Sequence, residues 1–292
     1  MRCAFLTMDD TEGWSIDAGL CIPHLEKLGW QVDWIPWRRP DVNWDSYDLV
    51  YTAATWDYPD NAVEFMQVIE AVAGSSASLV NPAELVRWNV TKTYLQDLQS
   101  RGIAIVPSQW YESFRKNDLA SWFEKAASQT IIVKPVISAN AANTFLLEEP
   151  VDAPTLTRLG SVFTDRAFMV QPFIESIRSE GEFSLFYIDG ALSHAIQKIP
   201  KQGDFRVQEE HGGNIVSANP GAQLKTAGEA VIRLVKPAPV YARADFVRAA
   251  DSGFLLMELE LIEPSMYLRM DDGAAQRFAA ALNRYARGSG AD

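Results

Sequence analysis

The sequence predicts an α/β unit at the N-terminus and α+β structure in the rest of the chain. Strand-like, helix-like and strand-like segments alternate over residues 2–54, an order typical of a parallel sheet. Farther on, turn signals at Asp189-Gly190 and Asp251-Ser252-Gly253 each join two strand-like segments, as in antiparallel hairpins. The 292 residues suffice for two or three compact units, at about 100 to 200 residues per domain.

The N-terminal unit is expected to contain three buried strands and one helix. The helix should end at Gly29, because glycine readily takes the left-handed conformation that follows a helix. The expected strands cover residues 2–7, 31–37 and 47–54, and the helix covers residues 17–28.

Ligands of parallel sheets bind beyond the carboxyl ends of the strands. Asp9 and Asp10 follow the first strand, and Thr55-Trp56-Asp57-Tyr58 follows the third. These loops are candidate substrate contacts. Equally, Trp56 and Tyr58 could pack over the sheet edge while Asp57 caps a turn.

After Asn81-Pro82 the pattern changes to helices, with Asn89 or Thr91 as the expected N-cap of a helix that reaches residue 100. A disordered tail is expected at 288–292. Further strands are expected over residues 130–135, 144–148, 167–174, 180–188, 191–200, 240–247 and 254–262, and helices from about Asp152 and over 222–235.

Composition excludes several classes of function. Lysine and arginine number 26 against 38 aspartate and glutamate residues, a net charge of −12, so nucleic acid or an anionic membrane is not expected as a partner. Cys3 and Cys21 lie in apolar patterns and are expected to be reduced core residues. The N-terminus lacks the apolar stretch of a signal peptide, and no apolar run approaches membrane-span length. We therefore expect a cytoplasmic protein.

The stretch MELELIEPS, residues 257–265, carries three carboxylates: Glu258, Glu260 and Glu263. A hairpin centred between residues 251 and 252 would place Asp245 opposite Glu258 and Arg243 opposite Glu260, all on one face. Met257, Leu259 and Leu261 would fill the other face. Carboxylates that face each other repel, so this face is expected to bind a hard divalent ion such as Mg²⁺. The alternative is a solvated polar face.

Two lysines are candidate phosphate ligands. Lys134 ends an apolar strand just before the small-residue loop SANAAN, residues 138–143. Lys92 is expected in the first turn of its helix, where the helix dipole disfavours a cation unless an anion joins it. For either lysine the alternative is a surface side chain whose stem packs on apolar neighbours.

Other catalytic signatures are absent from the sequence. It contains no GxxxxGK[ST] loop, no GxGxxG after the first strand and no GxSxG elbow. The three histidines, His24, His194 and His211, are scattered, which gives little support to a histidine-based metal site or triad.

With these motifs in place, the chain resembles the ATP-grasp superfamily of carboxylate-amine ligases. The likeness covers about Asn81 to Arg269, through NPAELVRWNVTK, IIVKP, MVQPFI, GEFSLFYIDG, RADF and ELELIEP. It is strongest to the glutathione-synthetase-like branch and to the cycloserine-forming cyclo-ligases (O-ureido-serine cyclo-ligases). The N-terminal sheet matches in layout and in the TWDY segment.

The resemblance implies an ATP-grasp fold: an N-terminal Rossmann-like sheet (1–85) for substrate, then a lid (86–172) and a C-terminal subdomain (173–292) that clamp ATP. Its members phosphorylate a carboxylate with ATP and Mg²⁺, for which Mn²⁺ is an alternative, and an amine then displaces the phosphate. A small amino-acid-like substrate is the implied partner, and a homo-oligomer stays open.

The resemblance also implies roles for individual residues. Lys92, Lys134 and Ser138 would contact phosphate, and Glu182 would hold the ribose. Lys198, Arg206 and Arg243 would stabilise the developing charge. Adenine would be read by Gln171, Pro172, Phe173 and Ile174, and the metal would be held by Asp245, Glu258 and Glu260.

Two features depart from the family pattern. Its third metal ligand is commonly asparagine, where this chain has Glu260, and its phosphate loop is normally glycine-rich, where this chain has SANAAN. The altered loop favours one rival reading, a nucleotide-binding regulatory module without turnover. The other rivals are a small-molecule kinase and, within the ligases, an intramolecular cyclo-ligase.

Overall fold

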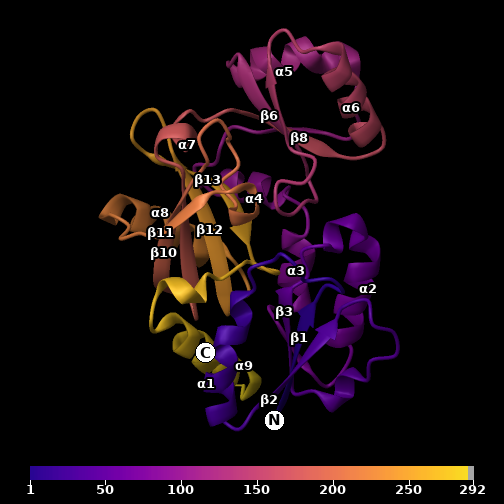
Figure 1. Cartoon of the computed structure of the whole chain (residues 1–292), viewed down its shortest axis with the longest axis vertical. Helices are drawn as coiled ribbons and strands as arrows, with labels where there is room; N and C mark the ends of the chain where they lie inside the picture. Colours follow the sequence, from indigo (N-terminus) through magenta and orange to yellow (C-terminus); the bar gives the residue numbers. More distant parts are fainter. Residues whose placement is uncertain (289–292) are drawn as a thin grey trace.

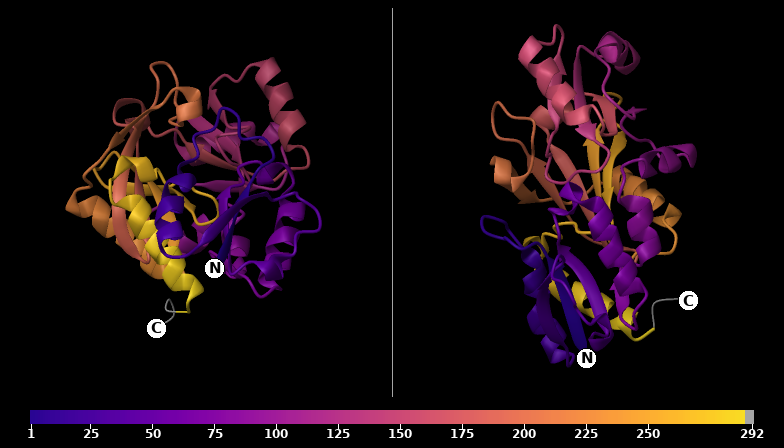
Figure 2. Two further views of the ribbon diagram at one scale, coloured as in Figure 1. Left: turned by 60° about the horizontal axis from the view of Figure 1, so that its bottom comes forward. Right: turned by 90° about the vertical axis from the view of Figure 1, so that its right-hand side faces the viewer.

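The computed structural model describes residues 1–288, which form three β-sheets with helices packed against them (Figure 1). The N-terminal sheet lies at one end of the molecule and the sheet of β6 and β8 at the other (Figures 1 and 2). The sheet that contains β12 lies between them. Of the predicted disordered tail, residues 289–292 lie outside the described part of the chain.

The N-terminal sheet is parallel throughout, with the strand order β2-β1-β3-β4, and confirms the prediction. Its strands are β1 (Arg2–Thr7), β2 (Gln31–Pro36), β3 (Leu49–Ala54) and β4 (Ser78–Val80). Its helices are α1 (Ile22–Lys27), α2 (Ala62–Ala73) and α9 (Ala274–Ala286).

The expected helix over residues 17–28 is in fact two pieces, the 3-10 turn η1 (Asp17–Cys21) and α1. Pro23 lies at the start of α1, where its missing N–H costs nothing, whereas it would break a continuous helix. Gly29 has a φ of +87° and ends this segment as predicted.

Both faces of the N-terminal sheet are covered. Phe5 and Tyr51 pack with Phe278 of α9 on one face, and Leu6 packs with Phe65 of α2 on the other. Cys3 and Cys21 are buried and unpaired within this core, which confirms the prediction of reduced core cysteines.

The second sheet is antiparallel, with the order β5-β8-β6-β7. Its strands are β5 (Gln109–Tyr111), β6 (Thr130–Pro135), β7 (Phe145–Glu148) and β8 (Phe168–Pro172), and its helices are α5 (Leu119–Ala126) and α6 (Ala153–Phe163). Trp122 of α5 and Phe163 of α6 are fully buried against Phe168. Asp152 caps α6 by accepting the Thr155 N–H at 2.7 Å.

The third sheet has the order β11-β10-β9-β12-β13. Its strands are β9 (Glu182–Ile188), β10 (Ala191–Ile199), β11 (Asn214–Ser217), β12 (Tyr241–Arg248) and β13 (Phe254–Glu260). Asp189 and Gly190 both have positive φ, 51° and 73°, as a tight hairpin turn requires. The helix α8 (Ala222–Leu234) packs on β12 and β13.

A β-bulge at Met257 sets the phase of the β12–β13 hairpin. Arg243 pairs with Glu260 and Asp245 with Glu258, as predicted, but Phe246 pairs with Leu256. The extra residue leaves Leu259 and Leu261 in the core with Leu256. The prediction for Met257 was wrong, because the bulge turns its side chain to the pocket together with Glu258.

The helical link after β4 contains α3 (Ala83–Asn89) and α4 (Tyr94–Ser100). Neither Asn89 nor Thr91 is an N-cap, because α3 already ends at Asn89 and the residue that precedes α4 is Thr93. Tyr94 and Leu98 pack against the third sheet. The predicted division at residues 85 and 172 stays a prediction.

The remaining short elements are α7 (Ser176–Ser179), η2 (Trp44–Ser46), η3 (Tyr58–Asp60), η4 (Lys116–Asp118), η5 (Glu209–His211) and η6 (Leu268–Met270). Within residues 1–288, no helix has both the length and the apolar character to cross a membrane.

Candidate active site

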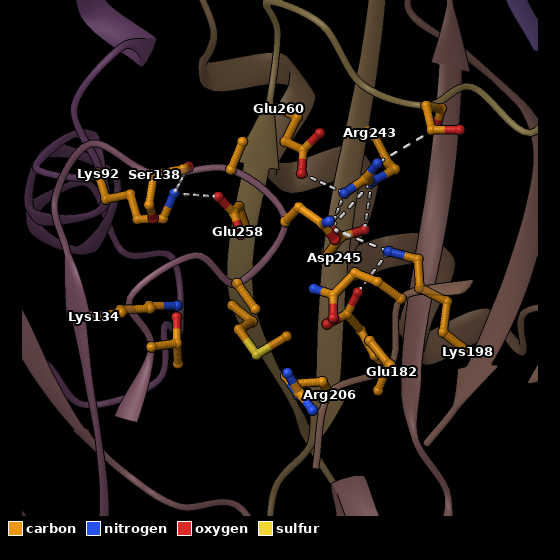
Figure 3. A pocket seen from close by; sticks show the side chains of 18 of the residues that line it. Lys92, Lys134, Ser138, Glu182, Lys198, Arg206, Arg243, Asp245, Glu258 and Glu260 are labelled. Atoms are coloured by element: carbon orange, nitrogen blue, oxygen red, sulfur yellow. Dashed lines mark hydrogen bonds and ion pairs between the residues drawn. The ribbon is translucent and has the colours of Figure 1, made fainter. Parts of the chain in front are cut away.

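One pocket is lined by residues of the second and third sheets and by the loops that follow β1 and β3 of the N-terminal sheet (Figure 3). Trp56 follows β3, Lys134 belongs to β6, Glu182 begins β9, and Asp245 and Glu258 come from the β12–β13 hairpin. The structure therefore brings together the predicted candidates from separate parts of the sequence. Every residue assigned above to nucleotide, metal or developing charge lines this pocket.

The acidic face of the hairpin is neutralised by basic side chains of the chain itself. The Arg243 guanidinium donates to Asp245 with its Nε and Nη2 atoms, at 3.1 Å and 3.0 Å, and also donates to Glu260. Burial alone would raise the pKa of Asp245, but Arg243 and Lys198 outweigh burial and lower it. Asp245 is therefore held as a carboxylate.

Lys198 contacts carboxylates on two neighbouring strands, β9 and β12. It lies opposite Glu182 in the β9–β10 register, with its Nζ 2.8 Å from Glu182 Oε1 and 3.6 Å from Asp245 Oδ2. All three side chains are buried. A charge-assisted contact of this kind is stronger than one in water, so it fixes the two carboxylates relative to each other.

Lys92 lies before α4 rather than in its first turn, so the expectation based on the helix dipole was wrong. The chain between α3 and α4 is a turn anchored by the Lys92 N–H, which donates to the Val136 carbonyl at 2.8 Å. The Lys92 ammonium donates to the Ser138 carbonyl at 3.0 Å and pairs with Glu258 at 2.6 Å. Burial alone would raise the pKa of Glu258, but the charges of Lys92 and Lys134 outweigh burial, and the pKa is lowered.

Lys134 differs from the other pocket lysines. Its ammonium has no hydrogen-bond or ion-pair partner among residues 1–288 (Figure 3), although the residue is only 9 % exposed. Burial lowers its pKa, and Glu258 acts in the opposite direction. A buried cation without a partner is unfavourable unless an anionic ligand joins it.

The carboxylates of Asp245, Glu258 and Glu260 do not form a ready-made metal cage. Within the described part of the chain, no three acidic, histidine or cysteine side chains lie close enough to hold an ion. Each of the three acids has a basic partner instead. Their oxygen donors nevertheless suit Mg²⁺.

The glycine-poor loop at residues 138–143 adopts the backbone that glycine would favour. Asn140, Ala141 and Asn143 have φ values of 49°, 54° and 54°, in the left-handed region that is costly for alanine. His211 Nε2 lies 3.4 Å from the Asn140 carbonyl. This loop and the loop before β11 therefore meet at the pocket.

The predicted adenine-reading segment also lines the pocket. Gln171 lies in the last part of β8, and its side-chain amide donates to the Ser108 hydroxyl at 2.8 Å. Phe173 is buried against Phe205. Arg206 lines the pocket while its guanidinium Nη2 pairs with Asp204 at 2.7 Å.

The N-terminal loops agree with the first alternative at Trp56 and Tyr58, and the expectation that the Asp57 side chain caps a turn was wrong, because it caps no backbone N–H of η3. Trp56 and Tyr58 line the pocket. Asp57 instead accepts from Trp37 Nε1 at 2.7 Å and pairs with Arg38. Asp9 and Asp10 are exposed and lie outside the pocket lining, so the suggestion that they contact substrate gains no support.

Sequence reasoning missed several pocket residues. The sequence gives Glu263 no predicted role. It lies beyond Glu258 and Glu260 at an odd spacing, so the two-residue period of a strand does not place it on their face. Trp14 lies in a loop without a sequence signal, and its ring is 5.1 Å from that of Trp56. Tyr267 also lines the pocket.

Two family models match the chain. The N-terminal domain of D-cycloserine synthetase DcsG matches residues 3–81, and the ATP-grasp domain of prokaryotic glutathione synthetase matches residues 98–237. Among curated proteins, the cycloserine biosynthesis protein DcsG of Streptomyces lavendulae is 29 % identical over 262 residues, which cover 84 % of this chain and 86 % of that protein.

Solved structures agree on the fold. The crystal structure of D-cycloserine synthetase DcsG superposes with a TM-score of 0.85 at 24 % identity, covering 98 % of this chain and all of the other. The ATP-grasp ligase PsnB, complexed with a phosphomimetic variant of its minimal precursor, Mg and ADP, has a TM-score of 0.66 at 16 % identity, with 98 % of each chain covered. Together these matches identify the chain as an ATP-grasp ligase that resembles the glutathione-synthetase-like branch and the cycloserine synthetase.

Proposed function

We propose that this protein uses ATP and Mg²⁺ to activate the carboxylate of a small amino-acid-like substrate as an acyl phosphate, which an amine of the same molecule then attacks. The observation that carries this proposal is the buried ammonium of Lys134, which has no partner in the described part of the chain and lines one pocket with the acidic hairpin. Such a pair of opposite charges suits a nucleotide phosphate bound together with a metal ion.

The residues present fit both groups. Asp245, Glu258 and Glu260 would hold Mg²⁺, or Mn²⁺ with its similar oxygen preference, and the metal would supply charge neutralisation at the phosphates. Lys92 and Lys134 would contact the phosphates. Lys92 would then exchange its contact with Glu258 for a phosphate oxygen, which frees that carboxylate.

The remaining nucleotide contacts follow from position. Gln171, Pro172, Phe173 and Ile174 would frame adenine, and Glu182 would accept from the ribose hydroxyls. Ser138, whose loop already has the left-handed backbone of a phosphate-binding loop, would lie beside the phosphates.

The reaction needs two displacements. A substrate carboxylate oxygen bonds to the γ-phosphorus of ATP. The bond between this phosphorus and the oxygen that bridges the β- and γ-phosphates breaks, and ADP leaves. The amine nitrogen then bonds to the acyl carbon, the carbon–oxygen bond to phosphate breaks, and the nitrogen loses a proton. Lys198, Arg206 and Arg243 would stabilise the developing negative charge, and positioning supplies most of the rate.

An intramolecular reaction is favoured over joining two molecules by the likeness to a cycloserine biosynthesis protein. Opening the cycloserine ring at its amide bond gives O-aminoserine, an amino acid that carries its own weakly basic nucleophile. This class of substrate, which includes O-ureidoserine, is therefore proposed for this chain.

The test is a screen of ATP turnover. Both enantiomers of O-aminoserine and O-ureidoserine, diamino acids and pairs of ordinary amino acids are offered with ATP and Mg²⁺, and ADP release is measured with product mass. A ring-closed product with equal amounts of ADP and phosphate supports the proposal, whereas a product joined from two molecules would contradict its intramolecular step. A stable phosphorylated product would make the protein a kinase, and nucleotide binding without turnover on any substrate would make it a regulatory module.

A further inference from the structure

The Glu263 carboxylate lines the pocket without a partner. The residue is only 7 % exposed. Within residues 1–288, no group donates a hydrogen bond to its side-chain oxygens and no basic side chain forms an ion pair with them. Asp245, Glu258 and Glu260 in the same pocket each have a basic partner. Glu263 is therefore the acid whose position protein contacts do not explain.

Hydrogen bonds from neighbouring elements hold the backbone at Ile262 and Glu263. The Trp56 indole donates to the Glu263 carbonyl at 2.8 Å, and the Tyr241 hydroxyl donates to the Ile262 carbonyl at 2.6 Å. Thr52 also donates to the Ile262 carbonyl. These contacts hold the segment that follows β13 against β3, the loop after β3, and β12, so Glu263 lines the pocket from a well-anchored backbone.

The surroundings make a lone carboxylate unfavourable. Burial, and then the charge of Glu260, raise the pKa of Glu263 well above its ordinary value. Aromatic residues lie next to this segment: the Trp56 indole donates to the Glu263 carbonyl, the Trp14 ring lies 5.1 Å from the Trp56 ring, and Tyr58 lines the same pocket. A carboxylate among aromatic faces matches an ammonium ion, which gains from both.

We infer that Glu263 binds a substrate ammonium group that takes no part in bond formation. The inference rests on the proposed function and narrows the substrate to amino acids with a free α-ammonium beside the reacting nitrogen. An ammonium is not nucleophilic, and a carboxylate partner stabilises that protonated form. The nitrogen at Glu263 is therefore the spectator, and the attacking nitrogen must be a second, less basic one.

A matched pair of probes tests this inference. O-Aminoserine carries the α-ammonium, while 3-(aminooxy)propanoic acid retains the carboxylate and the aminooxy nitrogen and lacks only that group. Binding of each is measured by calorimetry to the full chain with Mg²⁺ and a non-hydrolysable ATP analogue. The native protein should prefer the amino acid by about 10- to 100-fold, as expected for a buried charge-assisted contact.

Glu263→Gln should reduce that preference to about threefold or less, with little change in the affinity for the analogue, whereas the exposed Glu112→Gln control should keep it. Equal preference in native and Glu263→Gln protein would overturn the inference, and so would the absence of any binding of O-aminoserine by the native protein. Glu263→Asp, which keeps the charge on a shorter side chain, should retain part of the preference.

Two further readouts separate the possible failures. If O-aminoserine binds through Glu263 but yields no ring-closed product, the proposed reaction fails and the ammonium site stands. A purely structural role predicts a loss of stability in Glu263→Gln. Our inference predicts an equal or higher melting temperature without ligand, because the substitution removes a buried acid that has no partner among residues 1–288.

Discussion

Glu258 and Lys92 form an ion pair across the pocket, with 2.6 Å between Oε1 and Nζ. Replacing Glu258 by glutamine removes one proposed metal ligand while keeping the shape of the side chain. We expect a loss of about 10²- to 10³-fold in kcat, as when one group that stabilises charge is removed. The measurement is ADP release on the substrate found by screening.

The control for this substitution is Glu112→Gln, which alters an exposed acid outside the pocket. Circular dichroism and the melting temperature should be near native for both variants. Turnover by Glu258→Gln within about twofold of native would contradict the metal assignment.

Cys21 is fully buried, and burial raises the pKa of its thiol from 9.0 to about 12. Thiolate is the reactive form, so the folded protein should not react with Ellman's reagent at pH 8, and both cysteines should react in denaturant. Because the folded pKa is the higher one, this thiol contributes stability that is complete below pH 9 and is lost as the pH rises toward 12. Rapid labelling of the native protein would show that this core opens.

At this scale the sequence predicted which residues would gather but not how they would pair. Lys92 and Glu258 are separated by 166 positions, and their contact depends on how the α3–α4 turn meets β13. The contact of Glu263 with Trp56 likewise joins two distant segments, which the position of Glu263 after the strand does not reveal. Pattern and period describe a single element, whereas these contacts join elements.

At the scale of elements, the outer edge of β13 is completed near Leu256 by the backbone of residues 104–106 and farther along by side chains. Asn89 donates to the Leu259 carbonyl at 2.8 Å and accepts from the Leu261 N–H at 2.9 Å. The Tyr94 hydroxyl accepts from the Leu259 N–H at 2.8 Å. These bonds hold α3 and α4 to the strand that carries the acidic residues.

We expect Asn89→Ala to lower the free energy of unfolding by about 2–4 kcal/mol, because it orphans two buried backbone groups. Urea unfolding measures the change. Gln96→Ala, on the exposed face of α4, should change it by about 0.5 kcal/mol or less. A similar small change for Asn89→Ala would mean that water satisfies this edge.

The predicted pairs of the β12–β13 hairpin are present, although the predicted centre of its turn was wrong. The pairing beyond the bulge, Phe246 with Leu256, centres the turn on residue 251, half a residue from the predicted centre. The bulge at Met257 restores the predicted pairs at Asp245 and Arg243. Alternation of polar and apolar residues cannot reveal such a bulge. The single extra residue shifts which side chains face the core only at the position of the bulge, and the sequence does not mark that position.

At the scale of the whole molecule, the pocket is assembled from the second and third sheets and from loops of the N-terminal sheet, and it is already balanced by its own ion pairs. Mg²⁺ alone must compete with Arg243 and Lys92 for its ligands. We therefore expect Mg²⁺ alone to change the melting temperature by about 1 °C or less. Mg²⁺ with a non-hydrolysable ATP analogue at saturating concentration should raise it by about 5 °C or more.

Scanning fluorimetry or calorimetry makes this comparison, with Ca²⁺ and nucleotide without metal as controls. An equal shift with Mg²⁺ alone would show that the carboxylates bind metal before nucleotide. Mg²⁺ would then bind before the nucleotide, whereas the ion pairs predict that it binds together with the nucleotide.

The C-terminal helix α9 supplies Phe278 and Leu282 to the core of the sheet made from the first eighty residues. During synthesis on the ribosome, Phe5 and Tyr51 therefore lack this part of their packing until residues 274–286 have emerged. The N-terminal sheet thus reaches its final packing only after the other two sheets have been translated, and a chain that stalls before residue 274 would offer chaperones a partly open apolar face.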